Sequence, residues 1–374
     1  MKIKILIVVQ DISRAQEHEW FVEYLSRELF ELHFVLINGK GSYMDNFLIK
    51  QGIPVYYVNY RSKKDLIRVT FFIFRIILRE KFRIIHTHLF EATLTGLTAA
   101  WLARVPVRIY TRHYSDYHHV WFPSAVKFDR YNNFLATDII ATSVNVQNIL
   151  LQKEQVAGGK VHLIHHGIDM SDYQPDSVTP DRISGIRGRY SLLGKGPVIG
   201  AISRFTELKG LQFLIPAFER VLSNYPEAIL VLANASGDYK KEILALLGNL
   251  NPVNYRLIEF ENDIAALYKT FDCFVHIPVD ATAEAFGQTY LESLASLVPS
   301  VFTLSGVAPE FIKDKLNALV VPYKDSNAVE AAIYYILNDE ASVKEMIKFG
   351  YTSVATMFDI HIKISKLEQL YLAE

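Results

Sequence analysis

The chain of 374 residues is long enough for two domains, each with its own hydrophobic core. Half of the residues are hydrophobic and 21% are charged, which excludes a disordered chain. The net charge of −1 is unevenly divided, because residues 1–190 hold 24 basic and 18 acidic side chains whereas the remainder holds 15 and 22. This asymmetry predicts an anionic partner, other than nucleic acid, for the first half.

The cysteine content and the apolar runs indicate the compartment. Cys273 is the single cysteine, which excludes an internal disulfide and suits a reducing environment. Its apolar surroundings, FDCFVHIP, predict a buried side chain rather than a nucleophile. The opening MKIKILIVVQ is too short for a secretory signal and predicts a buried strand, and no apolar run reaches the ~18 residues of a membrane span. We therefore expect a cytoplasmic protein.

Strand-like and helix-like segments alternate through the first third of the chain. The expected helices lie near residues 17–32, within 61–83 and over 92–102, and the expected strands are KILIVV, HFVLI, PVYYV, RIIHTH and VRIYTRH. This alternation predicts a doubly wound parallel sheet, in which ligands bind beyond the carboxyl ends of the strands. The loops after the strands are therefore the expected positions of functional residues.

Residues 61–83, RSKKDLIRVTFFIFRIILREKFR, are both basic and strongly apolar. They include eight Lys and Arg against two acidic residues, interleaved with Phe71, Phe72 and Phe74. One interpretation is a helix on an anionic membrane surface, which would place the protein peripherally at the inner face of the cell membrane. The other is a core helix whose long basic side chains extend to solvent. The sequence leaves both open.

Two of the expected strands end in histidines, at His86-Thr87-His88 and at Thr111-Arg112-His113. His86 and His88 project to the same face of a strand, as two metal ligands would. No set of carboxylates converges on them, and the chain has no DxD metal-nucleotide motif. We therefore expect no metal site. The aromatic run over residues 114–133 suits either an acceptor cleft, where rings stack on sugars, or core packing.

A turn-rich stretch separates the two halves. The segment DIIATSVNVQNIL predicts a strand, a helix cap at Ser143 and a helix, and VHLIHHGIDMSDY follows it. Residues 171–181, SDYQPDSVTPD, are rich in turn formers, so the domain boundary is expected within or just after them. The expected domains are residues 1–180 and 190–356.

The stretch from Asp280 to Val298, DATAEAFGQTYLESLASLV, holds the strongest functional signal. It predicts a loop, a glycine at Gly287 and then a helix, whose N-terminus would suit a phosphate. Glu284 lies before that phosphate position and Glu292 behind it, and carboxylates accept hydrogen bonds from hydroxyls. Hydroxyl-bearing groups on both sides of a diphosphate describe a nucleotide-sugar. The alternative is an ordinary surface helix with an acidic first turn.

These motifs resemble those of retaining glycosyltransferases of family 4. Residues 284–292 resemble the E-x7-E signature, and Gly200, Arg204, Lys209 and Gly210 resemble the family's G-x-x-x-R-x-x-x-x-K-G pattern. The resemblance covers most of the chain. It departs at residues 10–16, which lack the family's glycine pair, and at His166, which replaces the asparagine of an "NGID" segment.

The resemblance implies an α/β protein of the GT-B fold, with two Rossmann-like doubly wound domains facing each other across a cleft. The first domain would bind the acceptor and the second the nucleotide-sugar, and an amphipathic helix over 357–374 would return to the first domain. The segment 256–263 would hold the base, and Ser305, Gly306 and Glu310 would lie near the second phosphate.

The resemblance also implies roles for individual residues. His113 would contact the sugar at its 6-position, Glu284 would orient the sugar, and Arg204 and Lys209 would stabilise the leaving diphosphate. Glu292 would bind the ribose. The implied catalytic residues are His113, Glu284, Arg204 and Lys209, and the implied donor-binding residues are Arg204, Lys209, Glu284, Phe286, Gly287, Gln288, Thr289 and Glu292.

The expected activity is transfer of a hexose, with retention, from a nucleoside-diphosphate sugar to a saccharide or lipid-linked acceptor in cell-surface polysaccharide or glycolipid synthesis. No cofactor is implied. Two alternatives share the fold: a nucleotide-sugar 2-epimerase, which needs no acceptor, and a degenerate member that only binds nucleotide. The E-x7-E spacing with Arg204 and Lys209 argues against the epimerase, while the missing glycine pair is the main support for the degenerate member.

Overall fold

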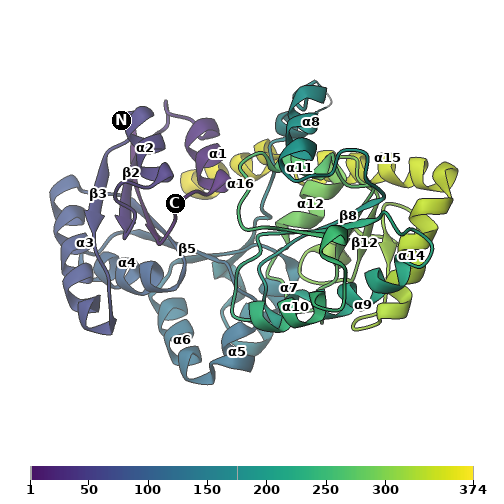
Figure 1. The fold of residues 1–374 in the computed structure, drawn as a ribbon. Coiled ribbons are helices and arrows are strands. Elements are labelled where there is room, and N and C mark those ends of the chain that lie inside the picture. The colour runs from purple at the N-terminus through teal and green to yellow at the C-terminus, as the bar shows by residue number, and fades with distance from the viewer. Residues whose placement is uncertain (1, 175, 374) are drawn as a thin grey trace. The chain divides into compact units, whose positions relative to one another are not determined.

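The computed structural model describes residues 2–174 and 176–373 (Figure 1). The chain divides into two α/β units, Met1–Gly167 together with Ile360–Glu374, and Ile168–Asp359. Each unit contains one parallel sheet with helices on both faces. This is the arrangement that alternating strands and helices produce, because each crossover returns the chain over a face of the sheet.

The first unit is built on a seven-stranded sheet of order β3-β2-β1-β4-β5-β6-β7, in which every neighbouring pair is parallel. The interior strand β1 pairs Ile5 with Leu32 of β2 on one side and with Ile84 of β4 on the other. The strands are β1 Ile3–Gln10, β2 Phe30–Ile37, β3 Val55–Val58, β4 Ile84–His88, β5 Val107–Arg112, β6 Asp138–Ala141 and β7 Val161–Leu163. All five strands predicted in the first third are confirmed.

Helices α3, α4 and α6 lie along one face of this sheet, and α1, α2 and α16 lie along the other (Figure 1). Leu6 and Val8 of β1 pack with Ile73 of α3 in one hydrophobic cluster. Ser143 caps α7, as predicted, by accepting a hydrogen bond from the Val146 amide. The helices are α1 Gln16–Tyr24, α2 Tyr43–Lys50, α3 Leu66–Glu80, α4 Phe90–Leu102, α5 Tyr117–Trp121, α6 Val126–Leu135, α7 Val144–Asn148 and α16 Ile360–Ala373.

The helix predicted near residues 17–32 is wrong in its second half. Helix α1 ends at Tyr24, Leu25 is extended, and Ser26 donates its amide to Glu368 at 2.8 Å. The strand β2 already begins at Phe30, which pairs with Ile3. Pairing with β1 inside the sheet therefore overrides the helical preference of the local sequence.

The second unit is built on a six-stranded parallel sheet of order β10-β9-β8-β11-β12-β13. Its strands are β8 Val198–Ile202, β9 Ile229–Ala233, β10 Tyr255–Ile258, β11 Cys273–His276, β12 Ser300–Phe302 and β13 Leu319–Val320. Its helices are α8 Pro180–Arg189, α9 Leu211–Val221, α10 Lys240–Leu247, α11 Ile264–Tyr268, α12 Gln288–Ala295, α13 Ala308–Phe311, α14 Ser326–Asn338 and α15 Glu340–Met357.

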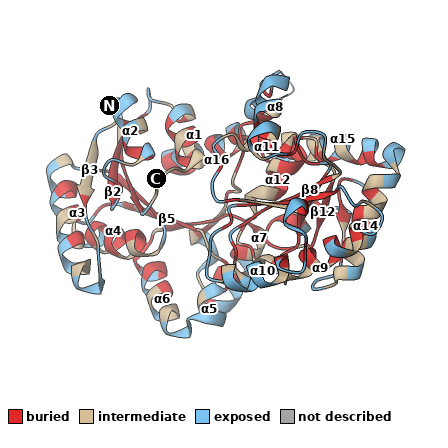
Figure 2. Ribbon diagram, in the orientation of Figure 1, coloured by how far each residue is buried: buried red, intermediate tan, exposed pale blue. Residues whose placement is uncertain are grey.

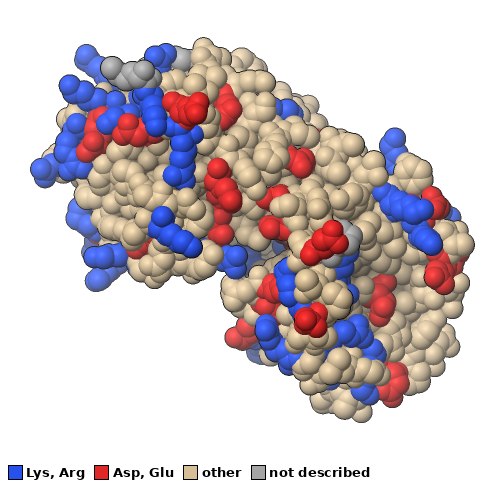
Figure 3. Space-filling model, turned by 90° about the horizontal axis from the view of Figure 1, so that it is seen from above, with Lys and Arg blue, Asp and Glu red and all other residues tan. Residues whose placement is uncertain are grey.

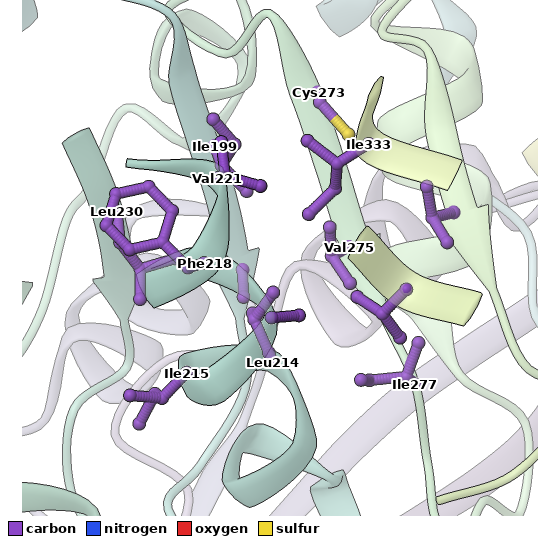
Figure 4. Close-up of a cluster of buried hydrophobic side chains, with 14 of the residues drawn as sticks. Ile199, Leu214, Ile215, Phe218, Val221, Leu230, Cys273, Val275, Ile277 and Ile333 are labelled. Atoms are coloured by element: carbon purple, nitrogen blue, oxygen red, sulfur yellow. The ribbon is translucent and has the colours of Figure 1, made fainter. Parts of the chain in front are cut away.

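A continuous apolar cluster fills one side of the second sheet (Figure 4). Ile199 of β8 and Val275 of β11 lie opposite Leu214 and Phe218 of α9, and Ile333 of α14 closes the cluster. Cys273 belongs to it and is fully buried, as predicted. Burial also raises the pKa of its thiol far above the usual value. Figure 2 shows the same pattern throughout both units, with buried strands and helices exposed on their outer faces.

The structural division begins the second unit at Ile168, before the turn-rich residues 171–181 where the sequence analysis places the boundary. The reason is local packing. The Ile168 amide donates to the Phe358 carbonyl at 2.9 Å, and Met170 and Tyr173 are buried. The return to the first unit starts at Ile360, where α16 begins. No helix in the described part of the chain has the length and apolar character of a membrane span.

Candidate active site

Two loops of the second unit meet beyond the carboxyl ends of its strands. The loop before α12 presents the Glu284 amide to Ser305 Oγ at 3.0 Å, and the Val307 amide donates to the Phe286 carbonyl at 2.9 Å. The Gly306 amide bonds to the Ala281 carbonyl at 3.2 Å. These cross-links hold the loop that precedes the helix in a fixed position.

Gly306 allows this close approach. Its φ is +61°, and a Cβ atom at this position would lie 2.5 Å from the Phe286 carbonyl oxygen and 2.8 Å from Glu284 Cβ. Gly287, the N-cap of α12, has a φ of +94°. Both glycines are therefore required by backbone conformation as well as by space.

Glu284 lies in a buried ionic cluster. Lys209 Nζ is 2.5 Å from Glu284 Oε1, and His276 Nε2 is 3.0 Å from the same oxygen. Burial alone would raise the pKa of Glu284, but the Lys209 ammonium and His276 outweigh burial and lower that pKa to about 2. Burial lowers the pKa of His276. Glu284 is thus a carboxylate at neutral pH, ready to accept hydrogen bonds.

Glu292 lies in the second turn of α12 in a different environment. Its Oε2 accepts a hydrogen bond from the Tyr268 hydroxyl at 2.9 Å. Burial raises the pKa of Glu292 to about 7, and this hydrogen bond only partly opposes the rise. The two carboxylates of the E-x7-E pattern therefore differ, because Glu284 has an ammonium beside it and Glu292 has a phenol.

The remaining predicted donor residues occupy distinct positions. Arg204 is exposed, on the loop between β8 and Lys209. Phe286 is buried, with its ring centroid 6.0 Å from that of Phe358, so its side chain serves packing. Gln288 and Thr289 are half-buried in the first turn of α12. Lys209 thus contacts Glu284 directly, whereas the Arg204 side chain is exposed to solvent.

The segment 256–263, predicted to hold the base, is fixed by residues of α8 and the turn after it. Glu261 Oε2 accepts from Arg189 at 2.6 Å and from the Tyr190 hydroxyl at 2.7 Å. Asp263 pairs with Arg182 at 2.6 Å. Two ion pairs and a hydrogen bond within the second unit therefore tie this loop to α8 and the residue after it.

The first unit gathers histidines at the carboxyl ends of its strands. His88 Nδ1 lies 3.0 Å from His113 Nε2, and the His113 ring stacks on His166 with centroids 5.5 Å apart. His86 contacts the Tyr371 hydroxyl at 2.7 Å and Thr111 at 2.8 Å. Burial is the main cause that lowers the pKa of His113 to about 3, so this imidazole is neutral at pH 7. A neutral imidazole can donate to or accept from a sugar hydroxyl.

Glu17 joins this cluster from α1. His166 Nδ1 lies 2.9 Å from its carboxylate, and Lys363 of α16 also bonds to it. Burial alone would raise the pKa of Glu17, but His166 and Lys363 hold it well below the usual value. Among the described residues, Glu17, His113 and His166 are the one group close enough to share a metal ion, with ligand atoms within 4.8 Å of one another. The Lys363 ammonium already supplies a cation to this carboxylate.

The loop over residues 10–16, which lacks the family's glycine pair, is held by side chains. Asp11 has a φ of +49° and accepts from Gln10 at 2.7 Å and from Asn38 at 2.9 Å. Arg14 lies over the ring of Tyr43, 4.7 Å from its centroid. Polar side-chain contacts therefore fix this loop in the absence of glycine.

The chain matches two known families, one in each half. Residues 19–172 match the family described as Glycosyltransferase Family 4, and residues 185–353 match Glycosyl transferases group 1. The chain belongs to glycosyltransferase family 4. This family membership identifies it as an enzyme that transfers glycosyl groups.

Named relatives of this glycosyltransferase act in polysaccharide and glycolipid synthesis. It is 25% identical to the capsular polysaccharide biosynthesis glycosyltransferase CapM of Staphylococcus aureus, over 94% of this chain and 92% of CapM. It is 28% identical to an alpha-monoglucosyldiacylglycerol synthase of Streptococcus pneumoniae, over 62% of this chain and 54% of the synthase. It is 20% identical to a galactosyltransferase of Escherichia coli named for a GlcNAc-diphosphoundecaprenol acceptor, over 99% and 95%.

Solved structures show the fold of this glycosyltransferase. Anabaena Alr3699/HepE, determined in complex with UDP and glucose, superposes with a TM-score of 0.84 at 19% identity, over the whole of both chains. A glycosyltransferase from Rickettsia africae gives a TM-score of 0.81 at 19% identity, over 99% of this chain and 98% of that one. Together with its two parallel-sheet α/β units, this likeness confirms the predicted GT-B fold.

Sequence reasoning missed several residues of this glycosyltransferase that contact the predicted ones. His276 ends β11, and Tyr268 ends α11, yet each contacts a glutamate of the E-x7-E pattern. Glu17 and Lys363 were missed because 346 positions separate them. A usable signal existed for His276, since polar residues at the carboxyl end of a buried parallel strand mark a ligand-binding edge.

Proposed function

We propose that this glycosyltransferase transfers a hexose, with retention of configuration, from a nucleoside-diphosphate sugar to a saccharide or lipid-linked acceptor. The observation that carries the proposal is the arrangement around α12. The ionised Glu284 precedes the N-terminus of the helix, Glu292 follows it, and Lys209 lies against Glu284. A diphosphate at the N-terminus would then have on either side a carboxylate that accepts hydrogen bonds from hydroxyl groups.

The donor in this proposal is a UDP-sugar. Support comes from Alr3699/HepE, which shares the fold and was solved with UDP-glucose. Glu292 would accept from ribose hydroxyls, and residues 256–263 would face the base. The first turn of α12, with Gly287, Gln288 and Thr289, would hold the phosphates through backbone amides. The ring of Phe286 is buried, so this residue would contribute only its backbone.

The proposed reaction needs no metal or cofactor from the protein. The acceptor oxygen forms a bond to the anomeric carbon on the face from which the diphosphate departs, and the acceptor proton passes to the departing diphosphate. Arg204 and Lys209 would stabilise the charge that develops on the leaving group. Glu284 would orient the sugar, so the ammonium of Lys209 would turn from Glu284 towards the diphosphate as the donor binds. His113 would contact the 6-position of the sugar.

The acceptor is proposed from the relatives. CapM is named for capsular polysaccharide, and the other two relatives are named for the lipids monoglucosyldiacylglycerol and GlcNAc-diphosphoundecaprenol. The basic character of the first unit suits an acceptor that bears phosphate or lies in an anionic membrane. We therefore propose a lipid-linked or surface saccharide as the acceptor, reached from the cytoplasm.

The stereochemistry can be tested without knowing the acceptor, through slow hydrolysis of the donor. The purified chain is incubated with UDP-glucose or UDP-galactose, and the first released sugar is followed by proton NMR before it mutarotates. We expect the α-anomer from an α-linked donor, and loss of release in Glu284→Gln but not in Lys241→Met, an exposed site on α10. Initial release of the β-anomer would contradict retention.

A further inference from the structure

The outward face of α3 is apolar where a surface helix is usually polar. Ile67, Phe71 and Leu78 are 82%, 59% and 54% exposed. Their spacing of four and seven residues places them on one side of the helix. The opposite side is already buried by Val69 and Ile73 among others, so the exposed stripe is not needed for the core.

Residues 61–83, which include α3, carry an excess of exposed positive charge. All eight of its basic side chains are exposed, whereas its two acidic side chains are half-buried and paired, Asp65 with Arg68 at 2.9 Å and Glu80 with Arg79 at 2.7 Å. Figure 3 shows Lys and Arg along the outer edge of the first unit, with Asp and Glu among them. The exposed basic residues are Arg61, Lys63, Lys64, Arg68, Arg75, Arg79, Lys81 and Arg83.

A second exposed apolar group lies in the segment formed by α5 and α6. Val120, Trp121 and Phe122 are consecutive and 58%, 49% and 52% exposed, and Phe134 near the end of α6 is 71% exposed. Lys127 and Arg130 are exposed between them. Helix α6 packs on α4, which packs on α3, so both groups belong to the helical layer on one face of the first sheet (Figure 1).

We propose that the outer faces of α3 and the α5–α6 segment bind an anionic lipid membrane. Exposed aromatic and aliphatic side chains flanked by Lys and Arg match the interfacial region of a bilayer, where apolar groups insert and basic groups meet lipid phosphates. A second copy of the chain fits less well, because a symmetric pairing through α3 would place its excess of positive charge against itself. The surface would hold the enzyme at the membrane that contains the proposed lipid-linked acceptor.

Vesicle binding tests this inference with the full chain. Wild-type protein is mixed with phosphatidylcholine vesicles with or without phosphatidylglycerol, and bound protein is measured by flotation. We expect binding only with phosphatidylglycerol, weakened by salt. Lys64→Glu with Arg75→Glu should reduce the partition coefficient at least about twentyfold, since each basic residue near such a surface contributes roughly fivefold. Phe71→Asn with Trp121→Asn should also reduce it.

Matched changes in the second unit control for charge and exposure. Lys241→Glu with Lys344→Glu makes the same charge change at exposed sites, and Phe349→Asn removes a half-exposed ring. These should bind vesicles like wild type. Equal loss in both sets, no wild-type binding to anionic vesicles, or dimerisation through this surface without vesicle binding would each overturn the inference.

The inference rests on the proposed function only for the nature of the acceptor. UDP binding to each variant, measured by melting shift in the absence of vesicles, separates the two proposals. We expect every variant to respond to UDP as wild type does. A UDP response with no vesicle binding would overturn the membrane surface alone, whereas vesicle binding with no UDP response would contradict only the donor proposal.

Discussion

Glu284 and Glu292 show how two identical side chains on one loop and helix acquire opposite ionisation behaviour. Burial disfavours the charged form of both. Lys209 and His276 reverse that effect for Glu284 and lower its pKa to about 2, whereas Glu292 has only the Tyr268 hydroxyl and a pKa of about 7. A ribose that donates two hydroxyl protons would favour the ionised form of Glu292, so donor binding at this site would be coupled to the ionisation of Glu292.

Glu292→Gln should stabilise the unliganded protein at pH 8. The pKa of Glu292 in the folded protein, about 7, lies above its ordinary value of 4.5, so the stability associated with protonated Glu292 is complete below pH 4.5 and is lost as pH rises through 7. The loss corresponds to about 3 kcal/mol. Thermal melting should show the variant above wild type at pH 8 and near it at pH 5, with Glu242→Gln on α10 unchanged. Equal melting temperatures at pH 8 would contradict the assigned ionisation.

Lys209→Met should destabilise the second unit by about 3 kcal/mol, because it leaves a buried carboxylate without its ammonium. Adding Glu284→Gln removes the charge and should restore most of the stability. Urea unfolding of the two single variants and the double variant gives the coupling free energy directly. Additive effects would show that the pair does not interact in the folded protein.

The junction of the loop before α12 with the loop after β12 sets the position of Glu284. Gly306→Ala should cost at least about 1–2 kcal/mol, because its φ is +61° and the new Cβ would meet the Phe286 carbonyl. It should also weaken nucleotide binding by displacing the backbone of Phe286 and Gly287, which is proposed to hold the phosphates. Gly185→Ala in α8 is the matched control, since nothing lies within 4 Å of its Cβ position. Melting and UDP titration measure both effects, and equal behaviour of the two variants would refute this role for Gly306.

The order of strands and helices could be predicted because each strand is a short apolar run bounded by turn formers. The end of α1 could not, because it depends on pairing of Phe30 with Ile3 and on Glu368, which lies 342 residues from Ser26. The spacing of Glu284 and Glu292 was readable, since both lie in one short loop and helix segment of the sequence. Their contacts with His276 and Tyr268 were not readable, because the fold alone brings the ends of β11 and α11 to that segment.

Each of the two units has a cluster of interacting polar side chains at the carboxyl ends of its parallel sheet. In the first unit these are chiefly histidines held by Glu17, Lys363 and Tyr371, and in the second they are the Glu284 cluster and Glu292. The chain crosses from the first unit to the second and returns through α16, which supplies Lys363 to the first unit. A double Rossmann-like organisation was readable from the sequence, whereas the histidine cluster required the return of α16.

Donor binding is tested by the melting temperature of the full chain with saturating UDP, GDP, ADP or CMP. Ligand at 100 times its Kd stabilises a protein by about 2.7 kcal/mol, which is easily seen as a shift. We predict a shift with UDP for wild type and for the exposed control Glu242→Ala, and a smaller shift for Glu292→Ala. No shift with any of the four nucleotides would contradict a donor site at α12.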